Sequence, residues 1–438
     1  MKITFLGAGS TVFVRNIIGD CMLLPALRDS EFALYDIDPV RLEESRSILE
    51  VMRKEMGGYG KISAYCGEEN RKEALQGAKF VVCAIAVGGY EATCVDFDIP
   101  NKYGLGQVIG DTTGVGGVMR ALRTIPVLEE ICADMREVCP DALFMNYSNP
   151  MAMLTGYVQR YCFPNTVGLC HSVQVCAKAL LTRLGMEDKL PGHKEKIAGI
   201  NHMAWLTELT DKDGNDLYPE VRARIAAGAE PKDKKDYVRF DYIRNFGYYC
   251  TESSLHHAEY SSFYIKSKYP ELLERFHINL GEYPERIQRQ IAEWKEEYKA
   301  LMDGTKKGHT KSREYGAEIM NAMVTGVPCQ IAGNVLNTGY LLTDFPEDAC
   351  VEVPCLVNGT GIHPTRVGKL PTVCAAMCRT EINVHLLGIE AAYEKSRDKV
   401  YQAVMMDPHA SSELDVDTIR KMVDELMAGH AKYLPQYK

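Results

Sequence analysis

The sequence predicts an α/β protein, in which a Rossmann-like, doubly wound parallel sheet is followed by an appended α+β C-terminal domain. Over the first 170 residues, short strand-like segments alternate with helical patterns, as in a parallel sheet covered by helices. One of these segments, residues 79–87 (KFVVCAIAV), is apolar throughout, which is typical of a strand buried on both faces. After about residue 172 the pattern changes. We therefore expect one domain over residues 1–171 and a second over residues 172–438.

The first domain is expected to alternate strands and helices. The expected strands cover residues 2–6, 32–35, 79–87, 142–147 and 166–169, and the expected helices lie near residues 11–24, 39–55 and 119–138. Pro39 suits the first turn of the second helix, because the N–H that proline lacks has no helical partner there.

The second domain combines strands with longer helices. Residues 197–211 are expected to form one strand, and Asp213-Gly214 favours a hairpin turn after it. A charged loop at residues 232–235 precedes an aromatic-rich stretch over residues 237–264. Helical patterns follow at residues 283–302, 311–324 and 371–404, and the apolar helices after residue 311 form either core or an oligomer interface.

Composition limits the class of protein. The chain has 438 residues, of which 46% are hydrophobic and 25% charged, as in ordinary globular proteins. The formal net charge of −9 argues against nucleic acid or an anionic membrane as the main partner. No stretch reaches the roughly 18 apolar residues that span a bilayer, and the apolar start is too short for a signal peptide. The 15 cysteines are odd in number and scattered, so we expect reduced thiols and a cytoplasmic location.

A dinucleotide-binding turn lies at the start of the chain. Gly7 and Gly9 follow the first expected strand and, with Ser10, precede a helix, so a pyrophosphate can approach the helix N-terminus. Asp36 ends the second strand, where a carboxylate holds the adenosine ribose hydroxyls and favours NAD over its 2′-phosphorylated form; Asp38 is the competing candidate. Val12 occupies the position of the third glycine of the fingerprint, which suggests looser packing of helix on strand. The sequence therefore predicts NAD as cofactor.

Cys170 and His202 form a candidate metal pair. Cys170 follows the strand expected at residues 166–169, and open α/β sheets bind ligands at the carboxyl ends of their strands. A thiolate and an imidazole, completed by substrate oxygens and water, can hold a divalent cation. A single cysteine and histidine about thirty residues apart are more commonly core residues, and spacing alone does not separate the two interpretations.

Several motifs in this order resemble the family 4 glycoside hydrolases, the NAD-dependent glycosidases that do not use the usual pair of carboxylates. These motifs are GAGS (7–10), GDTTGVGG (110–117), NP (149–150), GLCHSV (168–173), AGINH (198–202), TESS (251–254), SREY (312–315) and MMDPH (405–409). The resemblance covers nearly the whole chain. The Cys-His-Ser-Val form resembles the α-galactosidase branch, whereas phospho-glycosidase branches carry Asp or Asn after the cysteine.

The resemblance implies hydrolysis through transient oxidation. NAD oxidises the C3 hydroxyl of the sugar, which acidifies the proton on C2. A base removes that proton while a divalent metal, Mn²⁺ or another cation, stabilises the enediolate. The aglycone leaves from C1, water adds, and the hydride returns to C3. The family also suggests a homodimer or homotetramer.

The resemblance also implies roles for individual residues. Cys170 and His202 become the metal ligands, and Asn149 contacts the sugar hydroxyls. Asp111 binds substrate or orients groups near C2 and C3. His171 occupies the position of the general acid of the phospho-α-glucosidase branch and acts either as acid or only as a substrate contact. Tyr260 is the candidate base, or an aromatic packed among aromatics. On this basis residues 1–171 bind NAD, and residues 172–438 serve substrate and metal binding and oligomerisation.

The substrate implied is a neutral α-galactoside of the melibiose or raffinose type. Phospho-sugar branches carry basic residues soon after the strand at residues 79–87, but residues 88–96 (GGYEATCVD) contain no Lys or Arg, although Lys102 lies a little further on. An α-glucosidase or α-glucuronidase is the alternative within the family, because the sequence does not reveal the preferred C4 epimer. A glucuronate carboxylate needs a cationic partner that the sequence does not identify.

Two other classes share the N-terminal unit. A 2-hydroxy-acid dehydrogenase needs an arginine to hold the substrate carboxylate, for which Arg120 and Arg123 could be mistaken, and it consumes free NAD stoichiometrically. A non-catalytic NAD sensor with a degenerate site is disfavoured, because Asp111, Asn149, Cys170 and His202 are all intact.

Overall fold

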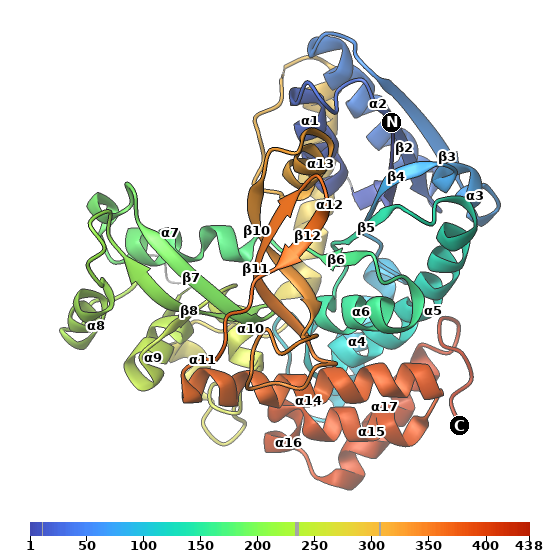
Figure 1. Ribbon diagram of the computed structural model, residues 1–438. Coiled ribbons are helices and arrows are strands. Elements are labelled where there is room, and N and C mark those ends of the chain that lie inside the picture. Colours follow the sequence, from blue (N-terminus) through green and yellow to red (C-terminus); the bar gives the residue numbers. More distant parts are fainter. Residues whose placement is uncertain (11, 233–235, 306–307) are drawn as a thin grey trace.

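The computed structural model describes residues 1–10, 12–232, 236–305 and 308–438. Over these residues the strands form one mixed sheet in the order β3-β2-β1-β4-β5-β6-β10-β11-β7-β8-β9, with β12 pairing with β11 (Figure 1). The strands are β1 (Lys2–Leu6), β2 (Glu31–Asp36), β3 (Lys61–Cys66), β4 (Ala78–Cys83), β5 (Leu143–Asn146), β6 (Thr166–Gly168), β7 (Lys194–Ile200), β8 (Met203–Thr210), β9 (Tyr249–Cys250), β10 (Cys329–Leu336), β11 (Cys350–Asn358) and β12 (Gly361–Pro364).

The helices cover both faces of the sheet (Figure 1). They are α1 (Val12–Leu23), α2 (Pro39–Glu55), α3 (Arg71–Leu75), α4 (Gly89–Lys102), α5 (Gly114–Val138), α6 (Met151–Tyr157), α7 (Ser172–Arg183), α8 (Tyr218–Ala226), α9 (Tyr237–Phe246), α10 (Ser254–Glu259), α11 (Glu271–Arg275), α12 (Glu282–Met302), α13 (Gly316–Thr325), α14 (Thr372–Glu394), α15 (Arg397–Met406), α16 (Pro408–Glu413) and α17 (Val416–Gly429). No helix among the described residues is long and apolar enough to cross a membrane.

The N-terminal half has the predicted Rossmann-like arrangement. Strands β3, β2, β1, β4, β5 and β6 pair in parallel. Along β4, Phe80 and Val82 belong to the core on one face of the sheet, and Val81 and Cys83 belong to the core on the other. This alternation is what a strand buried on both faces requires. The predicted fold class is confirmed.

The C-terminal half continues the same sheet with antiparallel strands. β6 bonds to β10 at Gly168 and Asn334, and β10 pairs along its length with β11. β11 in turn meets β7 at Glu352 and Gly199. Helix α14 packs against α5 and α6 of the parallel half and against β7 of the antiparallel half, below both in Figure 1. The two halves therefore share one continuous scaffold.

The single strand predicted over residues 197–211 is wrong. The chain reverses at Asn201 and His202, and β7 and β8 form an antiparallel hairpin around this turn. His202 has a φ of 64°, a left-handed backbone that lets the chain reverse without a glycine. The predicted turn at Asp213-Gly214 exists, but it leads from β8 to α8 instead of to a second strand.

Other boundaries also differ from the expectation. β4 ends at Cys83, four residues before the end of the predicted strand, because the chain there passes over Gly7 of the glycine turn. The helix predicted over residues 371–404 is two helices, α14 and α15, since Lys395 ends the first with a φ of 54°. The edge strand β3 and helix α7 were not expected. Of the charged loop predicted at residues 232–235, residues 233–235 lie outside the described residues.

The apolar helices after residue 311 belong to the core of this chain. Helix α13 buries Ala317, Ile319 and Met320, and α14 is buried along most of its length. Helix α13 begins five residues later than expected, because Ser312 is held by hydrogen bonds to Asp20 of α1.

Candidate functional site

The glycine turn lies at the carboxyl end of β1, the first strand of the parallel sheet. Gly7 has a φ of 79°, and a Cβ at this position would lie 2.6 Å from the carbonyl oxygen of Ala84. Glycine is therefore required at position 7. Ser10, at the end of a short 3₁₀ turn, has a buried Oγ with no hydrogen-bond partner among the described residues. An unpaired hydroxyl next to a helix N-terminus fits an anionic group such as a pyrophosphate.

The structure separates the two candidate acids after β2. Asp36 lies at the glycine turn, where its Oδ2 accepts a hydrogen bond from Gly9 N at 2.6 Å. Asp38 caps helix α2 by accepting bonds from the backbone N–H groups of Val40 and Arg41. Asp36 is thus the carboxylate that contacts the glycine turn. Val12 is 48% exposed, so its side chain does not lie between α1 and the sheet.

Cys170 and His202 come together with Glu252, and one ligand atom from each residue lies within 4.8 Å of the others. The sheet explains how residues so far apart in sequence meet. The bridges Gly168–Asn334, Asn334–Glu352 and Glu352–Gly199 form one row across β6, β10, β11 and β7. This row ends two residues before Cys170 on one side and three residues before His202 on the other.

Glu252 is the acidic member of this cluster. Its Oε2 lies 3.7 Å from Nε2 of His202, and its Oε1 lies 3.8 Å from Nε2 of His256. Burial raises the pKa of Glu252, but the imidazoles of His202 and His256 outweigh this and hold the pKa at about 2. The carboxylate is therefore ionised at neutral pH and available to a cation.

The donor set fits a divalent metal ion. Sulfur, imidazole nitrogen and carboxylate oxygen together suit a divalent first-row ion. Burial, followed by the charges of Glu252 and Glu352, raises the pKa of the Cys170 thiol. Since thiolate is the ligand form, cation binding at Cys170 must release a proton.

Tyr260 lies directly behind His202. Its hydroxyl is 3.3 Å from Nδ1 of His202 and 3.4 Å from Nδ1 of His256, and the side chain is almost fully buried. Burial, and then the charges of Asp111 and Glu381, raises the pKa of Tyr260 well above its ordinary value. The hydrogen bond fixes the orientation of the His202 ring, as partners behind a metal-binding histidine commonly do.

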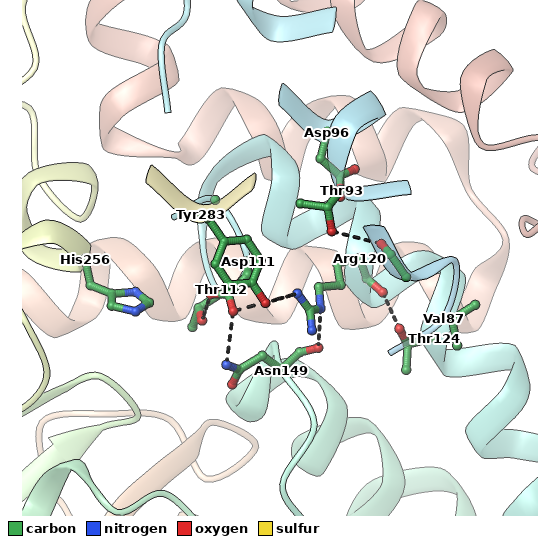
Figure 2. A network of polar contacts seen from close by, with 12 residues as sticks. Val87, Thr93, Asp96, Asp111, Thr112, Arg120, Thr124, Asn149, His256 and Tyr283 are labelled. Atoms are coloured by element: carbon green, nitrogen blue, oxygen red, sulfur yellow. Dashed lines mark hydrogen bonds and ion pairs between the residues drawn. The ribbon is translucent and has the colours of Figure 1, made fainter. Parts of the chain in front are cut away.

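Asp111 and Asn149 form a second polar group together with Arg120 (Figure 2). Nδ2 of Asn149 donates to Oδ2 of Asp111 at 3.4 Å, and a guanidinium nitrogen of Arg120 lies 3.7 Å from the same oxygen. Arg120 also donates to the carbonyl oxygen of Asn149 and to the hydroxyl of Tyr283. Burial raises the pKa of Asp111, but Arg120, His256 and His202 lower it below its ordinary value overall. Asp111 is therefore an ionised acceptor.

His171 lies at the outer side of the site and is half exposed, with Nδ1 3.4 Å from Oε1 of Glu314. The Glu314 carboxylate raises the pKa of His171, which favours the protonated imidazole. An exposed, protonated imidazole next to buried ligand atoms is suited to donate a proton to a bound molecule.

The structure therefore brings most of the residues predicted from sequence into one region. Tyr260, Cys170 and His202 are connected through contacts with one another and with His256 and Glu252. The Asp111–Asn149 pair lies close enough for the charges of His256 and His202 to act on Asp111. Gly7, Gly9, Ser10 and Asp36 form a separate group at the ends of β1 and β2. Sequence reasoning assigned no role to Glu252, His256, Glu314 or the Arg120–Asp111 pair, although Glu252 and Glu314 lie in two of the motifs.

Comparison with protein families matches two models to this chain. Residues 2–186 match the model described as family 4 glycosyl hydrolase, and residues 197–410 match its C-terminal domain. The chain is 51% identical to an α-galactosidase of Bacillus subtilis (strain 168), with 100% of both chains covered. It is 35% identical to an α-galactosidase of Rhizobium meliloti (strain 1021), covering 100% of this chain and 89% of the relative.

Solved structures share the fold. A 6-phospho-α-glucosidase from gut microorganisms, determined in complex with NAD and Mn²⁺, superimposes with a TM-score of 0.80. The superposition covers 100% of this chain and 99% of the glucosidase chain, and the two sequences are 20% identical.

Proposed function

The chain belongs to family 4 of the glycosyl hydrolases, and from this premise we propose that it is an α-galactosidase that removes terminal α-galactosyl groups from melibiose- or raffinose-type sugars. The main support for an α-galactoside as substrate is the 51% identity to an α-galactosidase over the whole of both chains. The cluster of Cys170, His202 and Glu252 beside Asp111 and Asn149 supports the same reaction class.

NAD and Mn²⁺ are the proposed cofactors. Support comes from the unpaired Ser10 hydroxyl, the three-donor cluster, and the family member determined with both cofactors. When bound, NAD⁺ supplies the transient oxidation at C3 of the sugar and the divalent ion supplies Lewis-acid stabilisation at the C2 and C3 oxygens. Gly7, Gly9, Ser10 and Asp36 hold the dinucleotide in this proposal.

The remaining roles fall to side chains around the cluster. Cys170 and His202 hold the metal ion, with Glu252 as a third donor. Asn149 and Asp111 bind and orient the sugar hydroxyls. Tyr260 would take the proton from C2 as its phenolate, which a cation held at the neighbouring His202 would favour over the phenol, and His171 protonates the leaving oxygen on C1. Residues 1–171 thus bind NAD, and residues 172–438 provide most of the substrate and metal site.

A neutral sugar is favoured over an anionic one, because the three cations that the sequence singled out already have carboxylate partners. Lys102 forms an ion pair with Glu425 of α17. Arg123 is paired bidentately with Asp96, and Arg120 is paired with Asp111. None of these three is free to hold a sugar phosphate or a uronate carboxylate. The same pairs weigh against a 2-hydroxy-acid dehydrogenase, which needs an arginine for its substrate.

The direct test is a panel of nitrophenyl hexosides with NAD, Mn²⁺ and a thiol reductant. We expect release from the α-galactoside to be fastest and to need only catalytic amounts of NAD. Equal or faster release from the α-glucoside or α-glucuronide overturns the substrate. Stoichiometric reduction of free NAD overturns the reaction class.

We propose further that the protein is a cytoplasmic homodimer or homotetramer. All fifteen cysteines are free thiols, which fits a reducing compartment. Light scattering of the purified protein decides the number of subunits.

A further inference from the structure

Glu259, the last residue of α10, lies under the loop that carries Asp111. Its Oε1 accepts hydrogen bonds from the backbone N–H groups of Val108, Ile109 (3.0 Å) and Gly110 (3.2 Å), and its Oε2 accepts from Gly110 at 3.1 Å. The side chain is 5% exposed. One carboxylate thus accepts hydrogen bonds from the three consecutive backbone amides that immediately precede Asp111.

The two ends of this contact lie next to two proposed site residues. On the loop side, Gly110 is followed by Asp111, whose carboxylate contacts Asn149 and Arg120. On the helix side, Glu259 is followed by Tyr260, whose hydroxyl contacts His202. A change in the Glu259 contact therefore moves Asp111 and Tyr260 relative to each other.

The other side of the loop is held as well. The carbonyl oxygens of Gln107 and Val108 accept bonds from the backbone N–H groups of Gly281 and Tyr283. The hydroxyl of Tyr283 accepts a bond from Arg120, the cation that faces Asp111 (Figure 2). The loop is therefore held by hydrogen bonds from both α12 and α10. Glu259 provides the bonds from α10, the helix that precedes the candidate base.

Burying a carboxylate here is costly in itself. Among the residues that the structure describes, no cation forms an ion pair with Glu259, and the carboxylate of Asp111 repels it. A buried anion without a cation persists only when hydrogen bonds compensate it. Burial, and after it the charge of Asp111, raises the pKa of Glu259 to about 7 even though the three amides lower it. The amides therefore compensate the anion only in part, and they tie the carboxyl group to the Asp111 loop in either protonation state.

We propose that Glu259 is a positioning residue that sets the distance between Asp111 and Tyr260 across the sugar-binding site. It touches neither substrate nor cofactor and acts through the loop and the helix that it joins. The inference rests on the proposed function, because hydrolysis of an α-galactoside is the activity in which the effect of Glu259 is measured. The hydrogen bonds of Glu259 to the loop can also be measured without catalysis.

The test compares Glu259→Gln and Glu259→Asp with the wild type. Glutamine keeps one acceptor oxygen but turns an NH₂ group toward the N–H of Gly110, whereas aspartate keeps the charge and shortens the reach. We expect kcat for nitrophenyl α-galactoside to fall at least tenfold in Glu259→Gln and less in Glu259→Asp. KM, NAD affinity and Mn²⁺ affinity should stay within about threefold. With substrate deuterated at C2, the kinetic isotope effect should rise, because misplacing Tyr260 slows proton removal.

Glu413→Gln is the matched control. Glu413 also accepts a bond from a backbone N–H, that of Ser267, but it lies on α16 and holds a loop with no proposed site residue. Its kcat should equal that of the wild type. Hydrogen exchange should show faster exchange at residues 108–110 in Glu259→Gln and at residue 267 in Glu413→Gln.

The proposal is overturned if Glu259→Gln exposes these amides and keeps wild-type kcat and isotope effect. It is also overturned if kcat falls only together with NAD affinity and the thermal unfolding midpoint. That result would mean that Glu259 stabilises the fold as a whole and does not position Asp111 and Tyr260. A wild type that prefers another hexoside refutes the proposed substrate instead, and the same comparison is then made with that hexoside.

Discussion

His202 and Glu252 face each other across the proposed metal site, with Nε2 of the histidine 3.7 Å from Oε2 of the glutamate, and both have left-handed backbones with φ near 65°. Such conformations cost non-glycine residues of order 1 to 3 kcal/mol each, and they persist where a function requires the side chain. The strain at both positions keeps two donor atoms directed at one point. Stability and metal binding should therefore oppose each other here.

Glu252→Gly is expected to separate these two effects. Removing the side chain relieves the left-handed backbone, which favours the metal-free protein by about 1 kcal/mol of unfolding free energy, before the loss of the carboxylate's contacts with His202 and His256 is counted. Its Mn²⁺ affinity, measured by electron paramagnetic resonance, should fall tenfold or more. Lys395→Gly is the control, because Lys395 has a φ of 54° at the end of α14, remote from the cluster. It should gain about 1 kcal/mol from the relieved backbone and bind Mn²⁺ normally, and unchanged Mn²⁺ affinity in Glu252→Gly would remove Glu252 from the donor set.

Cys170→Ser should abolish Mn²⁺-dependent hydrolysis while leaving NAD affinity within about twofold. The serine hydroxyl is not ionised near neutral pH and is a poorer ligand than thiolate. Oxidation of Cys170 should inactivate the enzyme for the same reason. The comparison is hydrolysis against Mn²⁺ concentration, with NAD binding followed by calorimetry. A variant with full activity contradicts the metal assignment.

The sequence predicts the parallel half of the fold well because its signals are local. The apolar strand ending at Leu6, the turn at Gly7 and the acid at Asp36 are adjacent features of one βαβ unit. The metal cluster is different, since β10 and β11, from residues 329–358, lie between β6 and β7 and bring Cys170 to His202. No spacing within residues 170–202 encodes that insertion. Glu252 lies in one of the motifs, but its role as a donor was missed, because its position depends on a left-handed backbone that no glycine or asparagine marks.

Asp36→Ala should weaken NAD binding by about tenfold, the equivalent of one or two charge-assisted hydrogen bonds to the ribose. It should also reduce the preference for NAD over its 2′-phosphorylated form, because the repelling carboxylate is gone. Asp38→Ala is the matched variant, since Asp38 caps α2. It should cost about 1 kcal/mol of stability and leave NAD affinity unchanged. Titration of both variants with the two dinucleotides checks the assignment, and the reverse pattern would make Asp38 the ribose ligand.

His171→Ala should affect substrates according to their leaving groups. Melibiose needs its leaving oxygen protonated, so its hydrolysis should fall by 10² or more. Nitrophenyl α-galactoside releases a stable anion and should lose less than tenfold. Steady-state rates on the two substrates give the comparison. Equal losses on both would reduce His171 to a substrate contact and leave the general acid to another group.

Asp407 should make the fold less stable as the pH rises. Its carboxyl group is buried at the start of α16, where Oδ2 accepts a bond from Ala410 N and burial raises the pKa to about 7. An unfolded aspartate has a pKa near 3.9, so the folded state binds this proton more tightly and loses the advantage as pH rises from about 4 to about 7. Asp407→Asn keeps an acceptor for Ala410 and removes the titration. The loss of unfolding free energy between pH 5 and pH 8, measured with urea, should therefore be smaller in the variant, by on the order of 2 kcal/mol.

The control is Asp415, which caps α17 from an exposed position. The hydrogen bonds that its carboxylate accepts, first that from the side chain of Thr418, lower its pKa. The stabilisation from Asp415 is complete above about pH 4, so Asp415→Asn should shift the curve without changing its slope over this range. Parallel curves for wild type and Asp407→Asn would show that Asp407 stays ionised in the folded protein.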